Sequence, residues 1–131
     1  MVARLPDACP CGSAARYDSC CGRYLDGRKA APTAEALMRS RYTAYALGRG
    51  AYLRQTWYPA TRPGSSQLDD DTGTQWIGLE VKRHERQDDT HATVEFVARY
   101  KVNGRAFRLR ELSRFVFENG QWFYVDGDID P

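Results

Sequence analysis

Four cysteines gathered near the start of the chain constrain its fold more than any other feature. Their spacing is C-x-C-x8-C-C, two short-range pairs separated by a loop. Such an arrangement can bring four soft ligands to the corners of a tetrahedron, which is the geometry that Zn²⁺ adopts in structural sites. Since the protein would supply all four ligands, we predict one structural zinc ion in a compact knuckle. The predicted ligands are Cys9, Cys11, Cys20 and Cys21.

Residues between and beside the cysteines suit this role. Pro10 stiffens the first pair, and Gly12 and Gly22 permit φ > 0 where the chain must curl around an ion. Arg16 and Arg23 lie close enough in sequence to offset the net negative charge of four thiolates and one Zn²⁺. These two arginines are also candidates for a surface that contacts a partner.

The alternatives to a metal site depend on where the protein works. Residues 1–6 lack the apolar stretch of a signal peptide, and no later segment approaches the roughly 20 apolar residues of a membrane span. We therefore expect a cytoplasmic protein without membrane insertion, where clustered cysteines are more often metal ligands than disulfides. Two disulfides or a redox pair are the alternative. A bond between adjacent Cys20 and Cys21 would be strained, and the sequence contains no C-x-x-C redox motif.

Length and composition allow one ordinary domain beside the knuckle. With 131 residues, of which 42% are apolar and 27% charged, the chain is typical of a soluble globular protein. The net charge of +2 is too small to indicate nucleic-acid binding by itself. We expect a knuckle over residues 1–25, a linker over 26–32 and an α+β domain over 33–131.

The first part of this domain has helical periodicity. Thr33 is placed to cap a helix that runs to Gly48, and apolar residues recur along it at spacings of three and four. A short second helix is expected over residues 51–57. Residues 61–74 are polar and rich in turn formers, and we interpret the run Asp69–Asp71 as a solvated turn because it lacks the spacing of a calcium loop.

Hairpin turns divide the rest of the chain into four predicted strands. Turn signals stand at residues 88–89, 103–104 and 119–120, and the last two are Asn-Gly. Counting outward from each turn places the same apolar residues on one face of an antiparallel sheet. The predicted cross-strand pairs are Val81–Phe96, Leu79–Ala98, Ala98–Leu109, Tyr100–Phe107, Phe115–Tyr124 and Phe117–Trp122. One main helix and a short one would then cover the apolar face of a curved four-stranded antiparallel sheet, an α+β architecture.

Two parts of the sequence resemble known families. The knuckle, with C-P-C-G-S at residues 9–13 and C-C-G at 20–22, resembles the SEC-C motif, the zinc-binding tail module of the bacterial translocation ATPase SecA. The stretches 32–46, 76–81 and 94–100 resemble the YchJ family of bacterial proteins. This likeness implies a SEC-C knuckle followed by a cone-shaped domain of the nuclear transport factor 2-like (cystatin-like) type. It implies no settled activity.

Carboxylates on the inner face of the predicted sheet are the candidates for chemistry. The register predicts the pairs Glu111–Phe96, Asp126–Ser113 and Asp128–Glu111. Carboxylates are rarely buried unless they are paired or functional, so Glu111 and Asp126 are candidate acid or base residues. A salt bridge between Arg41 and Glu111, or a bulge that turns Glu111 outward, is the structural alternative. The residues predicted to line a cavity in the cone are Tyr42, Tyr45, Phe96 and Trp122.

The outer face of the sheet is predicted to be basic, with Arg99, Lys101, Arg108 and Arg110. Arg99 lies directly opposite Arg108, and like charges in such a pair repel unless an anionic partner relieves them. Glu95 lies near Arg110 and neutralises part of this face, so a solvated surface is the simpler interpretation. Recognition of RNA here would lack the exposed aromatic row on which bases stack.

Three functions are consistent with these features. We favour a zinc-stabilised interaction or adaptor protein, not an enzyme, whose knuckle docks on a macromolecular partner; the SEC-C resemblance implies a protein of the export machinery or of the ribosome. The alternative is an enzyme or small-ligand-binding protein that uses the cone cavity, with Glu111 and Asp126 as its polar groups. A third possibility is RNA or ribosome binding through the basic hairpin, which predicts a steep dependence of affinity on salt.

Overall fold

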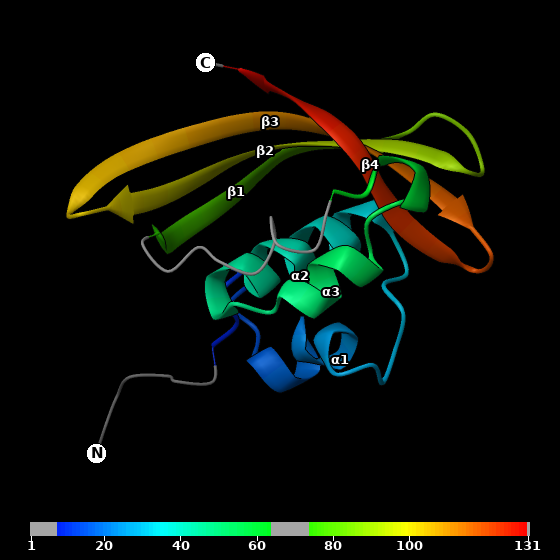
Figure 1. Ribbon diagram of the computed structural model, residues 1–131. Helices are drawn as coiled ribbons and strands as arrows, with labels where there is room; N and C mark the ends of the chain where they lie inside the picture. The colour runs from blue at the N-terminus through cyan, green and yellow to red at the C-terminus, as the bar shows by residue number, and fades with distance from the viewer. Residues whose placement is uncertain (1–7, 64–73, 131) are drawn as a thin grey trace.

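The computed structural model describes residues 8–63 and 74–130 and arranges them in three layers (Figure 1). A curved sheet forms the first layer, two helices cover its concave face, and the cysteine-bearing segment lies on the far side of these helices. The helices are α1 (Gly22–Leu25), α2 (Ala34–Leu47) and α3 (Gly50–Gln55), with short 3-10 helices at Tyr17–Ser19 and Pro59–Thr61. The strands are β1 (Thr74–Arg86), β2 (His91–Val102), β3 (Arg105–Glu118) and β4 (Gln121–Asp130). The predicted α+β class is confirmed.

The central helix α2 begins and ends where the sequence predicts. The Thr33 side chain accepts a hydrogen bond of 3.0 Å from the backbone N–H of Ala36, which satisfies one of the free donors of the first turn. Gly48 ends the helix in the left-handed region with φ of 73°. The short helix α3 follows at once and packs beside α2 (Figure 1).

The sheet is a simple meander in the order β1-β2-β3-β4, with all neighbours antiparallel. Both Asn-Gly turns have positive φ at each central residue: 52° and 79° at Asn103 and Gly104, and 54° and 81° at Asn119 and Gly120. Such turns match the right-handed twist of the flanking strands, so each one specifies the register beside it. All six predicted cross-strand pairs occur.

One irregularity changes which side chains face inward near the end of the chain. Phe115 pairs with Tyr124 as predicted, but Arg114 pairs with Asp126, so Val125 is an extra residue on β4. Because side chains alternate between the two faces of a strand, one extra residue reverses the face of everything beyond it. Gly127 therefore stands opposite Ser113, where Asp126 was predicted. Ile129 stands opposite Glu111, where Asp128 was predicted.

A single hydrophobic core connects the cysteine segment with the sheet. Cys11 and Tyr24 belong to the same buried cluster as Leu37 of α2 and Phe115 of β3. The division into knuckle, linker and main domain stays a prediction about the sequence. The predicted Asp69–Asp71 turn lies outside the described residues. None of the described helices is long and apolar enough to cross a membrane.

Candidate functional site

The first candidate site is the cysteine knuckle, whose backbone folds tightly on itself. The N–H of Cys9 donates to the carbonyl of Ala15 at 3.0 Å, and the N–H of Gly12 donates to the carbonyl of Cys9 at 3.2 Å. Gly12 and Ala14 both have positive φ, 81° and 71°. Gly12 was predicted to supply such a conformation; Ala14 adopts it despite its Cβ, which is unusual outside glycine and asparagine.

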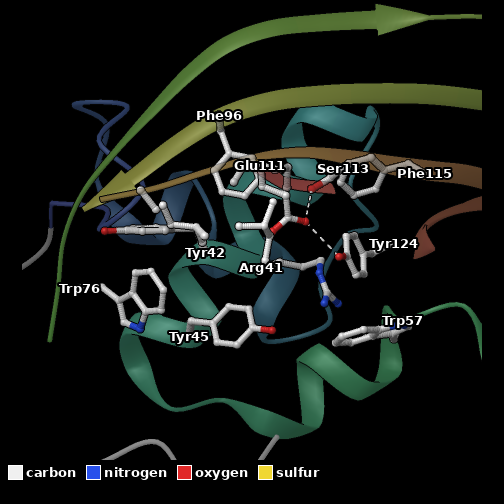
Figure 2. A pocket seen from close by; sticks show the side chains of 14 residues that line it. Arg41, Tyr42, Tyr45, Trp57, Trp76, Phe96, Glu111, Ser113, Phe115 and Tyr124 are labelled. Carbon is white, nitrogen blue, oxygen red and sulfur yellow. Dashed lines mark hydrogen bonds between the residues drawn. The ribbon is translucent and has the colours of Figure 1, made fainter. Parts of the chain in front are cut away.

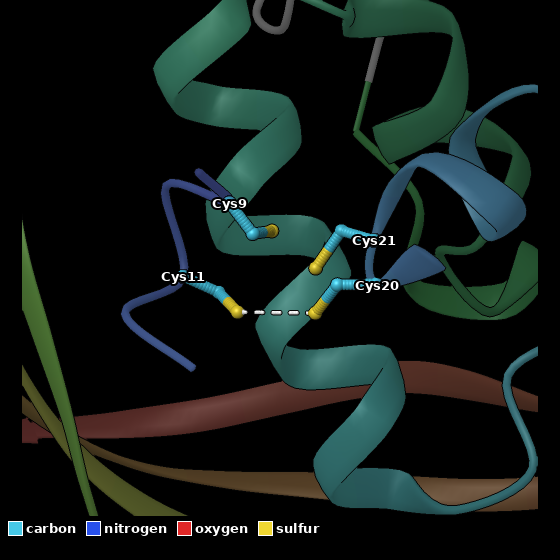
Figure 3. Close-up of side chains that lie close together, drawn as sticks. All are labelled: Cys9, Cys11, Cys20 and Cys21. Atoms are coloured by element: carbon cyan, nitrogen blue, oxygen red, sulfur yellow. Dashed lines mark hydrogen bonds between the residues drawn. The ribbon is translucent and has the colours of Figure 1, made fainter. Parts of the chain in front are cut away.

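The four sulfur atoms converge beside α2 (Figure 3). All lie within 4.8 Å of one another, and the Sγ atoms of Cys11 and Cys20 are 3.7 Å apart. Four Zn–S bonds of about 2.3 Å in a tetrahedron separate the sulfurs by about 3.8 Å. The four cysteines are free thiols in the structure. Their spacing therefore fits a metal ion with four thiolate ligands.

Contacts around the sulfurs shift the pKa values of two thiols in opposite directions. Hydrogen bonds from the Cys11 and Cys21 thiols lower the pKa of Cys9, while the same group of sulfurs and burial raise the pKa of Cys21. The hydroxyl of Ser13 lies 3.2 Å from the Cys20 sulfur, and that of Thr43 lies 3.8 Å from the Cys9 sulfur. Packing four thiolates this closely requires a cation to offset their mutual repulsion.

Arginines join the knuckle to its surroundings in different ways. Arg39 of α2 donates to the backbone carbonyl of Cys11 at 3.1 Å and to Glu35 at 3.0 Å, so it attaches the knuckle to the helix. Arg23 donates to the carbonyl of Cys20 at 3.1 Å and lies over the Tyr24 ring, so it supports the knuckle from within. Arg16, the other predicted surface arginine, is exposed.

The second candidate site is a cavity of about 350 Å³ between α2 and the concave face of the sheet (Figure 2). Tyr45 (38% exposed) and Ile129 (60% exposed) stand at its margin, where it meets solvent. Most of its wall is aromatic or aliphatic, with a few polar groups. Its lining residues are Met38, Arg41, Tyr42, Tyr45, Trp57, Trp76, Phe96, Ala98, Leu109, Glu111, Ser113, Phe115, Tyr124 and Ile129.

Glu111 faces into this cavity, as predicted, and is rigidly held. One carboxylate oxygen, Oε2, accepts hydrogen bonds from the Ser113 hydroxyl at 2.7 Å and from the Tyr124 hydroxyl at 3.0 Å (Figure 2). The space that the carboxylate occupies exists because Gly127 has no side chain: a Cβ there would collide with the Glu111 carboxylate. Burial and the neighbouring Glu111 charge raise the pKa of Tyr124, so its hydroxyl stays protonated and donates.

Arg41 is the cation of the cavity, and it is only 5% exposed. Its Nη1 donates to the carbonyl of Leu53 at 2.8 Å and to the hydroxyl of Thr56 at 2.7 Å. The guanidinium carbon lies 4.9 Å from the centre of the Trp57 ring and 4.6 Å from that of Tyr124 (Figure 2). Burial lowers the pKa of Arg41. Within the described part of the chain, the guanidinium bonds to these groups and does not form the alternative salt bridge with Glu111.

Two predicted cavity residues lie elsewhere. The Val125 bulge turns Asp126 to the outer face, where Arg114 binds it at 2.6 Å and also binds Asp128 at 2.9 Å. The prediction that Asp126 joins Glu111 inside the cone is therefore wrong. Trp122 is buried, but it lines a smaller cavity between α1, the segment before α2, α3 and β4 instead of the one that contains Glu111. Tyr42, Tyr45 and Phe96 line the main cavity as predicted.

The basic outer face is more neutral than the arginine pattern indicates. Arg99 does stand opposite Arg108, as predicted. However, Arg110 pairs with Glu95 at 2.6 Å, and Arg99 lies 4.0 Å from Glu80. Surface ion pairs of this kind are ordinary features of an exposed sheet.

Sequence reasoning overlooked several residues that shape the cavity. Trp57 and Tyr124 pack against Arg41, and Ser113 donates a hydrogen bond to Glu111. A signal for this arrangement was present in Gly127, since glycine within a strand often marks a bulge or the close approach of another group. Here the Val125 bulge and the Glu111 carboxylate both lie next to Gly127.

Comparison with known proteins places the chain in a family. The family model described as the YchJ middle NTF2-like domain matches residues 33–127. A UPF0225 protein of Cupriavidus metallidurans is 61% identical over 130 residues, covering 95% of this chain and 90% of that protein. The solution structure of a SEC-C motif containing protein from Rhodopseudomonas palustris has a TM-score of 0.85 at 34% identity, covering 92% of this chain and 96% of the other.

A crystal structure of a SEC-C motif containing protein from Psychrobacter arcticus has a TM-score of 0.83 at 30% identity, covering 97% of this chain and 85% of the other. The predicted resemblance to SEC-C and NTF2-like proteins is thus confirmed at the level of sequence and of fold. The cysteine knuckle, the meander with its covering helix and the match over residues 33–127 show together that the chain belongs to the YchJ (UPF0225) family of SEC-C motif proteins.

Proposed function

We propose that this protein binds a small organic molecule in the cavity between α2 and the sheet, and that a zinc-filled knuckle stabilises the fold around it. The observation that supports this most strongly is Arg41, a guanidinium that is 5% exposed and lines a largely aromatic cavity. Small-molecule sites are typically concave, mostly apolar and equipped with a few fixed polar groups. Glu111, held by Ser113 and Tyr124, is a second such group.

The hydrogen bonding of Arg41 favours a ligand over a purely structural role. Its Nη1 makes both of its hydrogen bonds, whereas Nε and Nη2 donate to no described residue. Burying a guanidinium is costly unless its charge and its donors are satisfied. The hydrogen bonds to Leu53 and Thr56 use only Nη1. The edge formed by Nε and Nη2 is therefore available to a molecule in the cavity.

The knuckle has a structural role in this proposal, and Zn²⁺ is the ion that its donor set fits best. Four thiolates form a closed tetrahedral shell without an open position for substrate. A four-cysteine site of this kind contributes directly to folding because the ligands are not preformed in the unfolded chain. The ion would hold residues 9–21 together and, through Arg39 and Thr43, support the face of α2 opposite the cavity.

A neutral aromatic probe tests whether the cavity accepts a ligand. The chain contains three tryptophans: Trp57 and Trp76 line the cavity, and Trp122 does not. In the zinc-loaded full chain, titration with benzyl alcohol should shift the indole N–H signals of Trp57 and Trp76 in ¹⁵N-correlated NMR spectra. The Trp122 signal should stay in place. Shifts spread equally over the three signals, or no shifts, would contradict the proposal.

Filling the cavity provides a matched pair of variants. Leu109 lines the cavity, whereas Leu112 lies three residues further along β3 on the outer face. Leu109→Trp should abolish the response to benzyl alcohol, and Leu112→Trp should preserve it. If Leu109→Trp does not fold, the tryptophan signals of the wild-type chain decide the question by themselves.

Docking of the knuckle on a macromolecule is the second candidate function. Residues 12–16, between the two cysteine pairs, are all exposed, although the cysteines beside them are largely buried. Such a short rigid loop suits contact with a protein partner in the cytoplasm, such as a component of the export machinery or the ribosome. Crosslinking in cells should recover specific partners with the wild-type chain and lose them with Ser13→Glu. Identical partners for both chains would argue against docking through this loop.

A further inference from the structure

On the basis of the proposed binding function, we infer the chemical class of the ligand: a small acid with an amino or hydroxyl group next to its carboxylate and an apolar or aromatic body. Among the described residues, Nε and Nη2 of Arg41 and Oε1 of Glu111 have no hydrogen-bond partner, and these two donors and one acceptor lie at the same end of the cavity. Such a ligand matches all three. Arg41 would bind the carboxylate, Glu111 would accept from the amine or hydroxyl, and the aromatic wall would enclose the body.

The free edge of Arg41 suits a carboxylate. Nε and Nη2 of a guanidinium point in parallel and form a fork that binds the two oxygens of a carboxylate together. In Arg41 this is the edge left without a partner, since both described hydrogen bonds use Nη1. The rings of Trp57 and Tyr124, which are in T-shaped contact with each other, both pack against the guanidinium, and the two hydrogen bonds of Nη1 to Leu53 and Thr56 hold it in place. The fork is therefore oriented before a ligand arrives.

The free oxygen of Glu111 supplies the complementary group. Oε2 accepts from Ser113 and Tyr124, while Oε1 accepts from no described residue. Tyr124 connects the two charged groups, because its hydroxyl donates to Glu111 and its ring lies against Arg41. Glu111 and Arg41 consequently stand at the same end of the cavity (Figure 2), within reach of adjacent groups on one small molecule.

Charge balance narrows the class further. One guanidinium and one carboxylate leave this end of the cavity with no net charge, so an isolated anion would be repelled by Glu111 and an isolated cation by Arg41. An α-amino acid is a zwitterion and adds no net charge to a poorly solvated site. An α-hydroxy acid pairs its carboxylate with Arg41 and donates its hydroxyl to Glu111. The apolar body of either would contact Trp76, Tyr42 and Phe96.

Four phenyl compounds that differ only in their polar groups test this assignment on the wild-type protein. L-Phenylalanine has both groups, 3-phenylpropanoate lacks the amine, 2-phenylethylamine lacks the carboxylate, and 3-phenylpropanamide is uncharged. A hydrogen bond to a charged group is worth about 1.5–3 kcal/mol, so each missing group should weaken binding about tenfold or more. L-Phenylalanine should bind with the highest affinity of the four in calorimetric titration. A further compound, 3-phenyllactate, carries a hydroxyl in place of the amine and should bind more tightly than 3-phenylpropanoate.

The outcomes separate this inference from the proposed function. If benzyl alcohol shifts the Trp57 and Trp76 signals but the four phenyl compounds bind with equal affinity, the cavity binds ligands and the assigned class is wrong. Tightest binding of the amine or of the amide would also overturn it. If benzyl alcohol and all four compounds fail to bind, both the function and the class are rejected.

Two substitutions test whether Glu111 and Arg41 recognise the polar groups of the ligand. Glu111→Gln should lower the affinity for L-phenylalanine about tenfold, because the lost charge attracts only the ammonium group. The affinity for 3-phenylpropanoate should stay equal or rise. Glu95→Gln, on the outer face, is the control and should change neither affinity. Arg41→Lys should reduce the advantage of carboxylates, since lysine lacks the fork. An equal loss for all four compounds in Glu111→Gln would indicate a structural role for Glu111 and contradict the inference.

Discussion

The knuckle and the cavity lie on opposite sides of α2 and are built in opposite ways. The knuckle takes its four cysteines from residues 9–21, and their sulfurs face one another. The cavity takes its lining from α2, the segment after α3 and all four strands, and Arg41 and Glu111 each keep an edge that no described residue occupies. Local sequence therefore specifies the first site, whereas the second depends on how distant segments meet. The following predictions test this contrast, from the largest expected effect to the smallest.

Removing one sulfur should have the largest effect. Cys20→Ser should reduce bound zinc from one equivalent per chain to almost none, measured by elemental analysis of the purified protein. Metal binding in comparable sites contributes about 10 kcal/mol or more to folding, so the melting temperature should fall steeply. Ser13→Ala is the matched control: its hydroxyl lies 3.2 Å from the Cys20 sulfur, but it is not a ligand. Full zinc content in Cys20→Ser would show that the site is not a four-thiolate centre.

Adding a methyl group beside Glu111 should have the next largest effect. Gly127→Ala places a Cβ on the Glu111 carboxylate, and overpacking of this kind costs about 1–3 kcal/mol. Gly78→Ala is the control within β1, because nothing lies within 4 Å of its Cβ position. Chemical denaturation measures both, with zinc content expected to stay unchanged. The double variant Glu111→Ala/Gly127→Ala should recover part of the loss, and strict additivity of the two losses would argue against the collision.

The corresponding glycine-to-alanine substitution in the knuckle, at Gly22, should not be rescued by a second substitution. A Cβ at Gly22 would lie 2.7 Å from the backbone oxygen of Tyr17 and 2.8 Å from its ring. Because part of this obstacle is backbone, Gly22→Ala should destabilise the knuckle, and Tyr17→Ala should not rescue it. The measurement is the rate of zinc loss to a chelator. Complete rescue would show that only the flexible ring obstructs the methyl group.

Weakening the shared helix should affect both regions moderately. Thr33→Ala removes the hydrogen bond to the N–H of Ala36 and should lower the free energy of unfolding by about 1 kcal/mol. Thr33→Ser keeps an acceptor at the cap and should behave almost like the wild type. Since α2 borders both sites, the retention of zinc and the binding of benzyl alcohol should weaken together. A change in only one of them would show that α2 does not couple the two regions.

The smallest expected effect is a change in alkaline stability. Burial raises the pKa of Tyr52 to about 12, and its hydroxyl lies 2.7 Å from that of Ser40 on α2. Because the folded pKa exceeds the unfolded one, the stabilisation is complete below pH 10 and is lost as the pH rises from about 10 to 12. Tyr52→Phe should reduce the slope of stability against pH in this interval. An unchanged slope would show that other groups dominate alkaline unfolding.

Much of the sheet was predictable because its turns are chemically specific. Asn-Gly at 103–104 and 119–120 adopts the positive φ values that a tight hairpin requires, and each turn then determines the pairs next to it. The prediction failed at Val125, because the turn at 119–120 specifies the pairing only as far as Tyr124, where the bulge begins. That single extra residue moved Asp126 and Asp128 outward and left Glu111 with Ser113 and Tyr124. Bulges respond to packing across the whole sheet, which a local pattern does not contain.

The sequence by itself determined the cysteine cluster, the extent of α2 and the order and main pairing of the strands. Each depends on residues close together in the chain: a C-x-C and C-C spacing, a threonine cap with a terminal glycine, and turn dipeptides. Only the tertiary structure decided which polar groups share the cavity. Arg41 and Glu111 lie far apart in sequence, and Tyr124 contacts both because α2 packs against the sheet. The bulge at Val125 then places Gly127 opposite Ser113 and leaves room for the Glu111 carboxylate. Long-range packing therefore set the chemistry of the cavity, whereas local geometry set that of the knuckle.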